Sequence, residues 1–278
     1  MTEETPKPWL SSVGPDRPVE ERAELWFQKW LYWFGRQFGT TPIYRHPVLP
    51  TAAFLSEVDD SIGLGQVEDL VAHLCELMMV DADLVKVEIF DGAADKKAGK
   101  KRTVGHFRMK DGQAIIALDH SEFSNPQTLT AIAVHELCHL RLLGERRLRR
   151  NNPDGERLTD LLTVYFGFGI FTTNAAMSFA RAHPGWRIVS RGALDDRTLN
   201  AARNEGYSRL GYLTTAEFGY ALACYCWLRR EETVPAWASY VNPGPYVYLE
   251  QGLAYLKRAS RTGELPPRVV PRRHQPNG

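Results

Sequence analysis

The sequence contains little cysteine and has no excess of charge of either sign. Its four cysteines, in 278 residues, are too few for a disulfide-stapled scaffold, and we expect them to be reduced thiols in a cytoplasmic protein. Lysine and arginine total 34 against 33 aspartates and glutamates, so the formal net charge of +1 predicts no general attraction to nucleic acid or membrane. The composition is ordinary for a water-soluble chain, which is long enough to bury a sizeable core as one large domain or two small ones.

The two ends of the chain lack hydrophobic periodicity. Residues 1–18 are polar and proline-rich, without the apolar core of a secretory signal, and we expect a flexible leader there. Residues 263–278 are basic and proline-rich, and we expect a disordered tail. Between these ends we predict a single domain over residues 19–262, with no internal repeat at solenoid spacing.

Aromatic residues recur at helical spacing near the N-terminus and predict an amphipathic helix over residues 19–39. The apolar positions are Trp26, Trp30, Trp33, Phe34 and Phe38. A membrane-surface helix would need a more basic polar face, so we expect this stripe to pack against the rest of the protein. A second amphipathic helix is predicted over residues 65–80.

Three short β-rich runs follow, over residues 83–90, 105–109 and 113–119. The first two are separated by a stretch rich in glycine and lysine, residues 91–105, which we expect to be a mobile loop. Helical patterns account for most of the remaining chain. The sequence therefore predicts an α+β fold that is predominantly helical, with one small sheet.

The longest uncharged run, residues 161–180, is long enough to span a bilayer. Several hydroxyl and amide side chains and two glycines interrupt it, so we predict a pair of core helices instead. Further helices are predicted over residues 211–232, with Thr214 or Thr215 as the N-cap, and over residues 246–260.

The chemistry lies in a helix predicted over residues 124–144, with Ser124 or Asn125 as N-cap. This helix contains the pattern His-Glu-x-x-His. His135 and His139 fall one turn apart on one face, close enough to bind one metal ion, while Glu136 is rotated by about 100° and lies beside that ion. A chance occurrence of this pattern in such a chain has odds of roughly one in a hundred.

A pair of carboxylates follows at the start of the next predicted helix, residues 156–166. Glu156 and Asp160 share one face of this otherwise apolar helix. Burying them is costly unless each has a partner, and a metal ion for one and a histidine N–H for the other would meet that need. The alternative is that both carboxylates only stabilise the positive end of the helix dipole.

The motif His135-Glu136-x-x-His139, followed by Glu156-x-x-Thr159-Asp160, resembles the gluzincin branch of the zincin metallopeptidases over about residues 84–170. The resemblance implies one zinc ion per chain bound by His135, His139 and Glu156, with Glu136 as the general base and Asp160 orienting a histidine. The order of strand 113–119, motif helix and glutamate helix also resembles this family, whose edge strand lies along the substrate cleft.

The resemblance has departures. Residues 159–169 are also similar to zincins in which an aspartate, followed by tyrosine and glycine, is the third ligand, so Asp160 is the alternative to Glu156. Cys138 occupies a position before the second histidine where the family often has a small residue, and ligation by this thiol is not expected.

Peptide hydrolysis would also need a donor for the oxyanion of the tetrahedral intermediate. Candidates in this sequence are Tyr165, His183, Tyr207 and Tyr212. The sequence does not choose among them.

The resemblance implies a zinc-dependent hydrolase that cleaves peptide bonds with a zinc-bound water, acting on a peptide or protein substrate. The alternative is a catalytically silent, zincin-like regulatory or partner-binding protein, although Glu136 would then have no use. The arginine-rich stretch over residues 141–150 is a weak indication of nucleic-acid contact, because no binding motif accompanies it. The sequence specifies no oligomeric state.

Overall fold

The computed structural model of the chain describes residues 16–55, 63–92, 104–181 and 213–263. These residues form a mostly helical α+β fold with a three-stranded mixed sheet, which confirms the predicted fold class. They group into two compact units. We call residues 45–213 the central unit and the chain on either side of it the terminal unit. The single domain predicted over residues 19–262 covers both units and stays a prediction.

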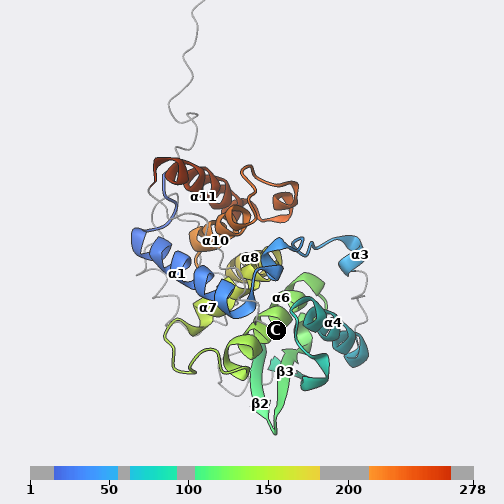
Figure 1. The fold of residues 1–278 in the computed structure, drawn as a ribbon. Coiled ribbons are helices and arrows are strands. Elements are labelled where there is room, and N and C mark those ends of the chain that lie inside the picture. Colours follow the sequence, from blue (N-terminus) through green and yellow to red (C-terminus); the bar gives the residue numbers. More distant parts are fainter. Residues whose placement is uncertain (1–15, 56–62, 93–103, 182–212, 264–278) are drawn as a thin grey trace, which may run out of the picture. The chain divides into compact units, whose positions relative to one another are not determined.

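The central unit contains the sheet and the helices around it (Figure 1). Its elements are α3 (Ala52–Leu55), α4 (Leu64–Leu77), the 3-10 turn η2 (Ala82–Leu84), β1 (Val85–Phe90), β2 (Gly105–Lys110), β3 (Gln113–Asp119), the 3-10 turn η3 (His120–Glu122), α6 (Pro126–His139), the π-helical turn η4 (Leu140–Gly144), α7 (Gly155–Tyr165) and α8 (Gly169–Arg181). The predicted strands and the predicted helices of this region are therefore confirmed.

The central strand of the sheet is β3, which pairs in parallel with β1 and antiparallel with β2. Six of its residues, Ala114 to Asp119, are buried, as the unbroken apolar run predicts for a strand covered on both faces. The family resemblance equated this strand with an edge strand along a substrate cleft, and that assignment is wrong. The edge position beside α6 belongs to β2, whose polar residues suit an exposed edge.

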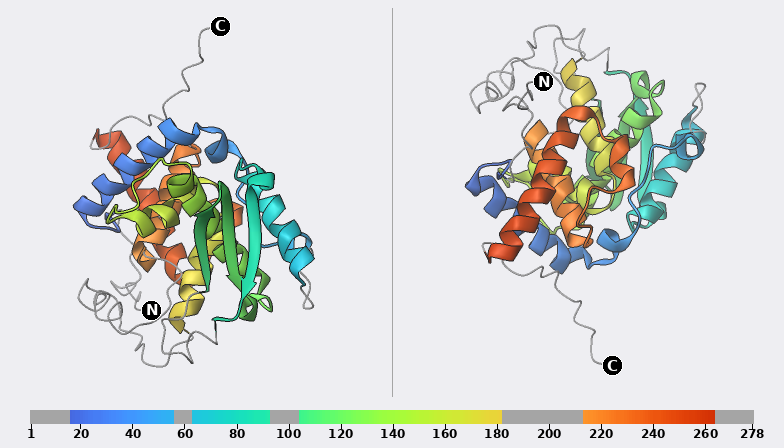
Figure 2. Two further views of the ribbon diagram at one scale, coloured as in Figure 1. Left: turned by 90° about the horizontal axis from the view of Figure 1, so that it is seen from below. Right: turned by 90° about the horizontal axis from the view of Figure 1, so that it is seen from above.

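Helix α6 lies at the centre of this unit. Its N-terminus is fixed by Asn125, whose Oδ1 accepts a hydrogen bond from the Thr128 N–H at 3.1 Å, and by Pro126 in the first turn. The helix packs against β2 and β3 and also against α7 and α8, and its residues from Thr128 to Cys138 are all buried. Figure 2 shows the three strands side by side, with α4 next to β1. A helix enclosed in this way holds its side chains in fixed directions.

The uncharged run over residues 161–180 forms the end of α7 and most of α8, which confirms the predicted core helix pair. The chain turns between them at Gly167, where a φ of 88° favours glycine. Thr163 and Thr172 bring their hydroxyls within 2.8 Å of each other inside this pair, which accounts for two of its polar residues. Among the described residues, no helix combines the length and the apolar character needed to cross a membrane.

The terminal unit consists of α1 (Glu21–Phe38), α2 (Thr41–Tyr44), α10 (Thr215–Leu228), the 3-10 turn η5 (Ala236–Tyr240) and α11 (Pro243–Thr262). The aromatic stripe of α1 is largely buried here, and the Phe27 ring meets Tyr220 of α10 edge-on at 5.4 Å. Three of the five predicted stripe residues, Trp30, Phe34 and Phe38, are also buried, which confirms that the stripe packs against protein. Helix α10 begins with a capping box of Thr214 and Glu217, so Thr214 is the N-cap.

Candidate metal centre

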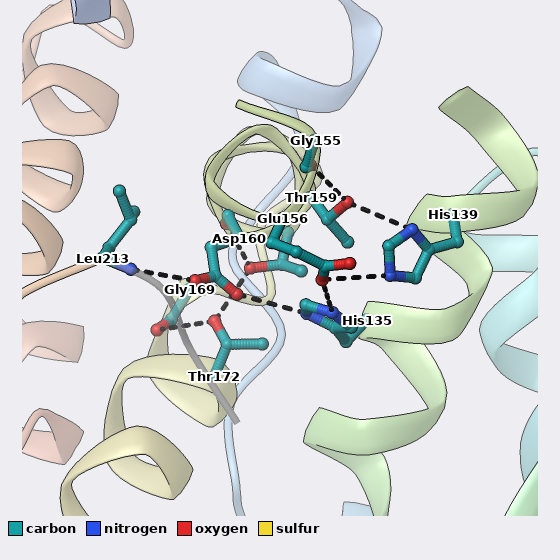
Figure 3. A network of polar contacts seen from close by, with 10 residues as sticks. His135, His139, Gly155, Glu156, Thr159, Asp160, Gly169, Thr172 and Leu213 are labelled. Carbon is teal, nitrogen blue, oxygen red and sulfur yellow. Dashed lines mark hydrogen bonds and ion pairs between the residues drawn. The ribbon is translucent and has the colours of Figure 1, made fainter. Parts of the chain in front are cut away.

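Two histidines of α6 and one glutamate of α7 point towards a common position (Figure 3). His135 and His139 lie one helical turn apart, with ring centroids 4.9 Å from each other. Oε2 of Glu156 lies 3.3 Å from Nε2 of His135 and 3.3 Å from Nε2 of His139. One ligand atom from each of the three residues therefore lies within 4.8 Å of the others.

This geometry fits a zinc ion. With bonds of about 2.0–2.1 Å, neighbouring ligand atoms of a tetrahedral zinc site lie about 3.3–3.4 Å apart. Both distances from Glu156 to the histidines match that separation. Two imidazoles and one carboxylate are also the donor set of many catalytic zinc sites, which leave a further position open. The Glu156 side chain is 44% exposed, so the cluster can be reached from solvent.

Asp160 lies on the opposite side of His135 from Glu156. Its Oδ1 is 3.2 Å from Nδ1 of His135, and its Oδ2 accepts a hydrogen bond from the Leu213 N–H at 3.1 Å. The carboxylate is almost completely buried. Because Nδ1 and Nε2 are on opposite edges of the ring, Asp160 can fix the direction of His135 while Nε2 faces Glu156.

The charges of the cluster are coupled. Burial alone lowers the pKa of His135, but hydrogen bonds to Asp160 and Glu156 outweigh it and raise the pKa to about 10. Burial alone would raise the pKa of Glu156. Hydrogen bonds with His135 and His139 outweigh this effect and hold the pKa of the carboxyl well below its usual range. The carboxylates of Asp160 and Glu156 thus favour a positive charge at the histidine rings. A divalent cation bound there can supply that charge in place of a proton.

Glu136 is buried next to the cluster, on the side of β2. Burial raises the pKa of its carboxyl, while His135, His139 and a backbone hydrogen bond from Phe107 oppose the shift without cancelling it. A raised pKa suits a group that accepts a proton and then gives it away. The carboxylate also approaches the start of β2, because a methyl group on Gly105 would lie 3.1 Å from its Oε1.

Of the remaining candidates, the structure describes Tyr165 and Cys138. Tyr165 is buried at the end of α7 with its ring against Phe166, and its role as an oxyanion donor stays a prediction. His183, Tyr207 and Tyr212 lie outside the described residues. Cys138 is buried, and burial raises the pKa of its thiol well above the usual value, which disfavours the thiolate needed for ligation.

Sequence reasoning gave no role to Thr159. Its hydroxyl lies 3.4 Å from Nδ1 of His139. The signal was present in the sequence, since Thr159 directly precedes Asp160 on the helix that begins with Glu156. A hydroxyl beside a histidine cannot be recognised from spacing alone, because threonine is common on buried helix faces.

A second group of possible ligands lies at one end of the sheet and consists of Asp91, Asp119 and His120. Oδ1 of Asp119 accepts hydrogen bonds from the N–H groups of Gly92 and Ser121, so this carboxylate already stabilises the turn after β3. Asp91 and His120 are exposed. Because one carboxylate of this group already accepts backbone hydrogen bonds and its other two members are exposed, it is the weaker candidate.

No protein-family model, curated protein or solved structure matches the chain. The geometry of the cluster is therefore the basis for a functional conclusion.

Proposed function

We propose that the chain is a zinc-dependent hydrolase of the zincin type, and specifically a metallopeptidase with a glutamate as third ligand. The observation that carries this proposal is the single oxygen of Glu156 that lies 3.3 Å from Nε2 of both His135 and His139. Glu136, the residue after the first histidine, is buried beside this cluster. A ligand set and a base in adjacent positions are the two parts that metal-assisted hydrolysis requires.

Each residue of the cluster has its own role in the proposed reaction. His135, His139 and Glu156 would hold the ion, and the ion, when bound, would supply a Lewis acid that lowers the pKa of a water molecule at the site towards about 7. Glu136 accepts the proton of the attacking water and delivers it to the departing amine. Asp160 keeps His135 in the tautomer whose Nε2 is free to bind.

Glu136 favours an enzyme over a silent zinc-binding protein. A structural zinc site is usually closed by four protein ligands, whereas the candidate ligand set here has three members and a further buried carboxylate, Glu136, beside it. Burying this carboxylate costs free energy, as the raised pKa of Glu136 reflects. A role in proton transfer would explain why the chain has a carboxylate at this costly position.

Elemental analysis of the purified protein is the first test. We expect about one zinc per chain in the wild type and a loss of zinc in His139→Ala. His120→Ala is the matched control, because it removes the histidine of the second ligand group. If His120→Ala lost its zinc and His139→Ala kept it, the metal would be bound by the group of Asp91, Asp119 and His120. That result would contradict the proposal.

Activity is tested next, with a peptide library and mass spectrometry. Glu136→Gln is expected to keep its zinc and to cut at least about 100-fold more slowly than the wild type, because the base is absent. If the wild type binds zinc but cleaves no peptide, and Glu136→Gln behaves in the same way in both assays, the alternative of a silent zinc-binding protein is favoured.

A further inference from the structure

Thr159 on α7 lies against the second histidine of the cluster. Its Oγ1 is 3.4 Å from Nδ1 of His139, and it is also 2.9 Å from the backbone oxygen of Gly155, one turn earlier in the helix. The residue is 0% exposed. Water therefore does not compete for the hydroxyl, and its hydrogen bonds have fixed partners (Figure 3).

The direction of these two hydrogen bonds follows from chemistry. The Gly155 carbonyl can only accept, so the single hydrogen of the threonine hydroxyl is donated to it. The hydroxyl then has only lone pairs left for His139, and the ring nitrogen must be the donor. A neutral His139 that carries its hydrogen on Nδ1 has a free lone pair on Nε2, the atom that faces Glu156.

The two histidines are thus held in the same way by adjacent residues. Asp160 accepts a hydrogen bond from Nδ1 of His135, and Thr159 is placed to accept one from Nδ1 of His139. Since Glu156 lies on the same helix, α7 offers one candidate ligand and a partner for each histidine. Outer partners of this kind fix the tautomer and the ring direction of metal-binding histidines.

We propose that Thr159 is a positioning residue for His139, holding its ring and tautomer ready to bind the metal ion. The inference rests on the proposed metal site and adds a residue outside its ligand set. A threonine at this place supplies an acceptor without adding a further carboxylate to a site that already contains Glu136, Glu156 and Asp160.

The test compares zinc affinities, measured by competition with a chromophoric chelator. Thr159→Val removes the hydroxyl and keeps the shape, and we expect its zinc affinity to fall about 10–100-fold. Thr159→Ser restores the hydroxyl and is expected to stay within about 3-fold of the wild type. Thr159→Ala serves as a second hydroxyl-free variant if the valine variant does not fold.

Thr130 provides a matched control on α6. It is also 0% exposed, and its hydroxyl donates to the Pro126 carbonyl at 2.8 Å, one turn earlier. Within the described part of the chain, Thr130 has no hydrogen bond to a histidine. Thr130→Val therefore removes the same kind of hydrogen bond from a buried helix position. We expect its zinc affinity to equal that of the wild type.

Cobalt substitution adds a readout that a loss of stability alone would not change. The visible absorption of bound Co²⁺ reports its ligand geometry, so the spectrum of Thr159→Val should differ from the wild type while those of Thr159→Ser and Thr130→Val should not. The same affinity and spectrum in Thr159→Val as in Thr130→Val would overturn the inference.

The remaining outcomes separate this inference from the proposed function. An equal loss of affinity in Thr159→Val and Thr159→Ser would overturn it as well, because the hydroxyl would not be the cause. In either case a wild type that binds zinc and a His139→Ala variant that does not would leave the proposed function in place. A wild type unable to bind zinc would remove both.

Discussion

Glu156 and Asp160 lie one helical turn apart on α7 and differ in length by one methylene group, yet they meet opposite edges of an imidazole ring. The longer side chain reaches the Nε2 atoms of His135 and His139, and the shorter one meets Nδ1 of His135. Sequence alone left both as possible third ligands. The distances support Glu156 as the ligand and Asp160 as the orienting group, because a ring bound through Nε2 presents only its Nδ1–H to Asp160.

This assignment predicts different losses for two variants. Glu156→Gln removes the carboxylate ligand, and we expect it to lose zinc during dialysis against a chelator that the wild type withstands. Asp160→Asn keeps all three ligands, and its zinc affinity should fall only about 10–100-fold. Elemental analysis and chelator competition measure the two effects.

Asp154→Asn is a suitable control for these two variants, because Asp154 lies just before α7 and its carboxylate faces Arg157. Oδ1 of Asp154 is 3.9 Å from Nη1 of Arg157. Its zinc content should match the wild type. Complete loss of zinc in Asp160→Asn together with retention in Glu156→Gln would make Asp160 the ligand and exclude the arrangement favoured by the distances.

At the scale of elements, the sequence was sufficient to predict the strands and most helices of the central unit. Strand β3 reads as an unbroken apolar run and α6 as a capped helix, and both patterns survive in the structure because burial on all sides is their physical cause. The order of strands in the sheet was not readable. It depends on which strands pair through their backbones, and no local pattern contains that information.

The parts of the site that escaped prediction are those set by tertiary contact. Residue spacing placed His135, Glu136 and His139 on one helix, because helical geometry fixes side chains one turn apart. The role of Thr159 depends on how α7 packs against α6, and the hydrogen bond from Leu213 to Asp160 joins residues far apart in the chain. Neither contact leaves a periodic signal.

The contact between β2 and α6 makes Gly105 critical. A methyl group there would lie 2.5 Å from Cγ2 of Ile132, closer than packed atoms can approach, so the strand would have to move away from the helix that carries Glu136. We expect Gly105→Ala to lower the free energy of unfolding by about 1–3 kcal/mol, as overpacking does in cores. Urea unfolding curves measure this change.

Gly65 on α4 is the control for Gly105, since a methyl group there would meet nothing within 4 Å. Gly65→Ala should leave the stability unchanged or raise it by up to about 1 kcal/mol, because alanine restricts the unfolded chain. Equal unfolding midpoints for Gly105→Ala and the wild type would mean that β2 can shift freely.

At the scale of the whole molecule, the candidate metal centre belongs to one of the two units. The three candidate ligands, Glu136 and Asp160 all fall in the central unit, and Leu213, which donates to Asp160, is its last residue. A metal ion that binds only the folded state stabilises the part of the chain that must be folded to bind it. Zinc should therefore protect the central unit in particular.

Two buried cysteines can report on this protection, Cys75 in the central unit and Cys226 in the terminal unit. Burial, with a smaller effect of Asp81, raises the pKa of Cys75 to about 12, and burial also raises the pKa of Cys226. At pH 8 both thiols are therefore protonated and inaccessible in the folded chain. Alkylation, which requires the exposed thiolate, occurs only when the surrounding structure opens.

We expect zinc at about 100 times its dissociation constant to slow the alkylation of Cys75 by up to about 100-fold, since the opened state becomes rarer by that factor. Iodoacetamide labelling followed by mass spectrometry gives both rates in one sample. Cys226 should react at the same rate with and without zinc, and His139→Ala should abolish the effect on Cys75. Equal protection of both cysteines would contradict the expectation, because zinc would then stabilise the two units as one cooperative structure.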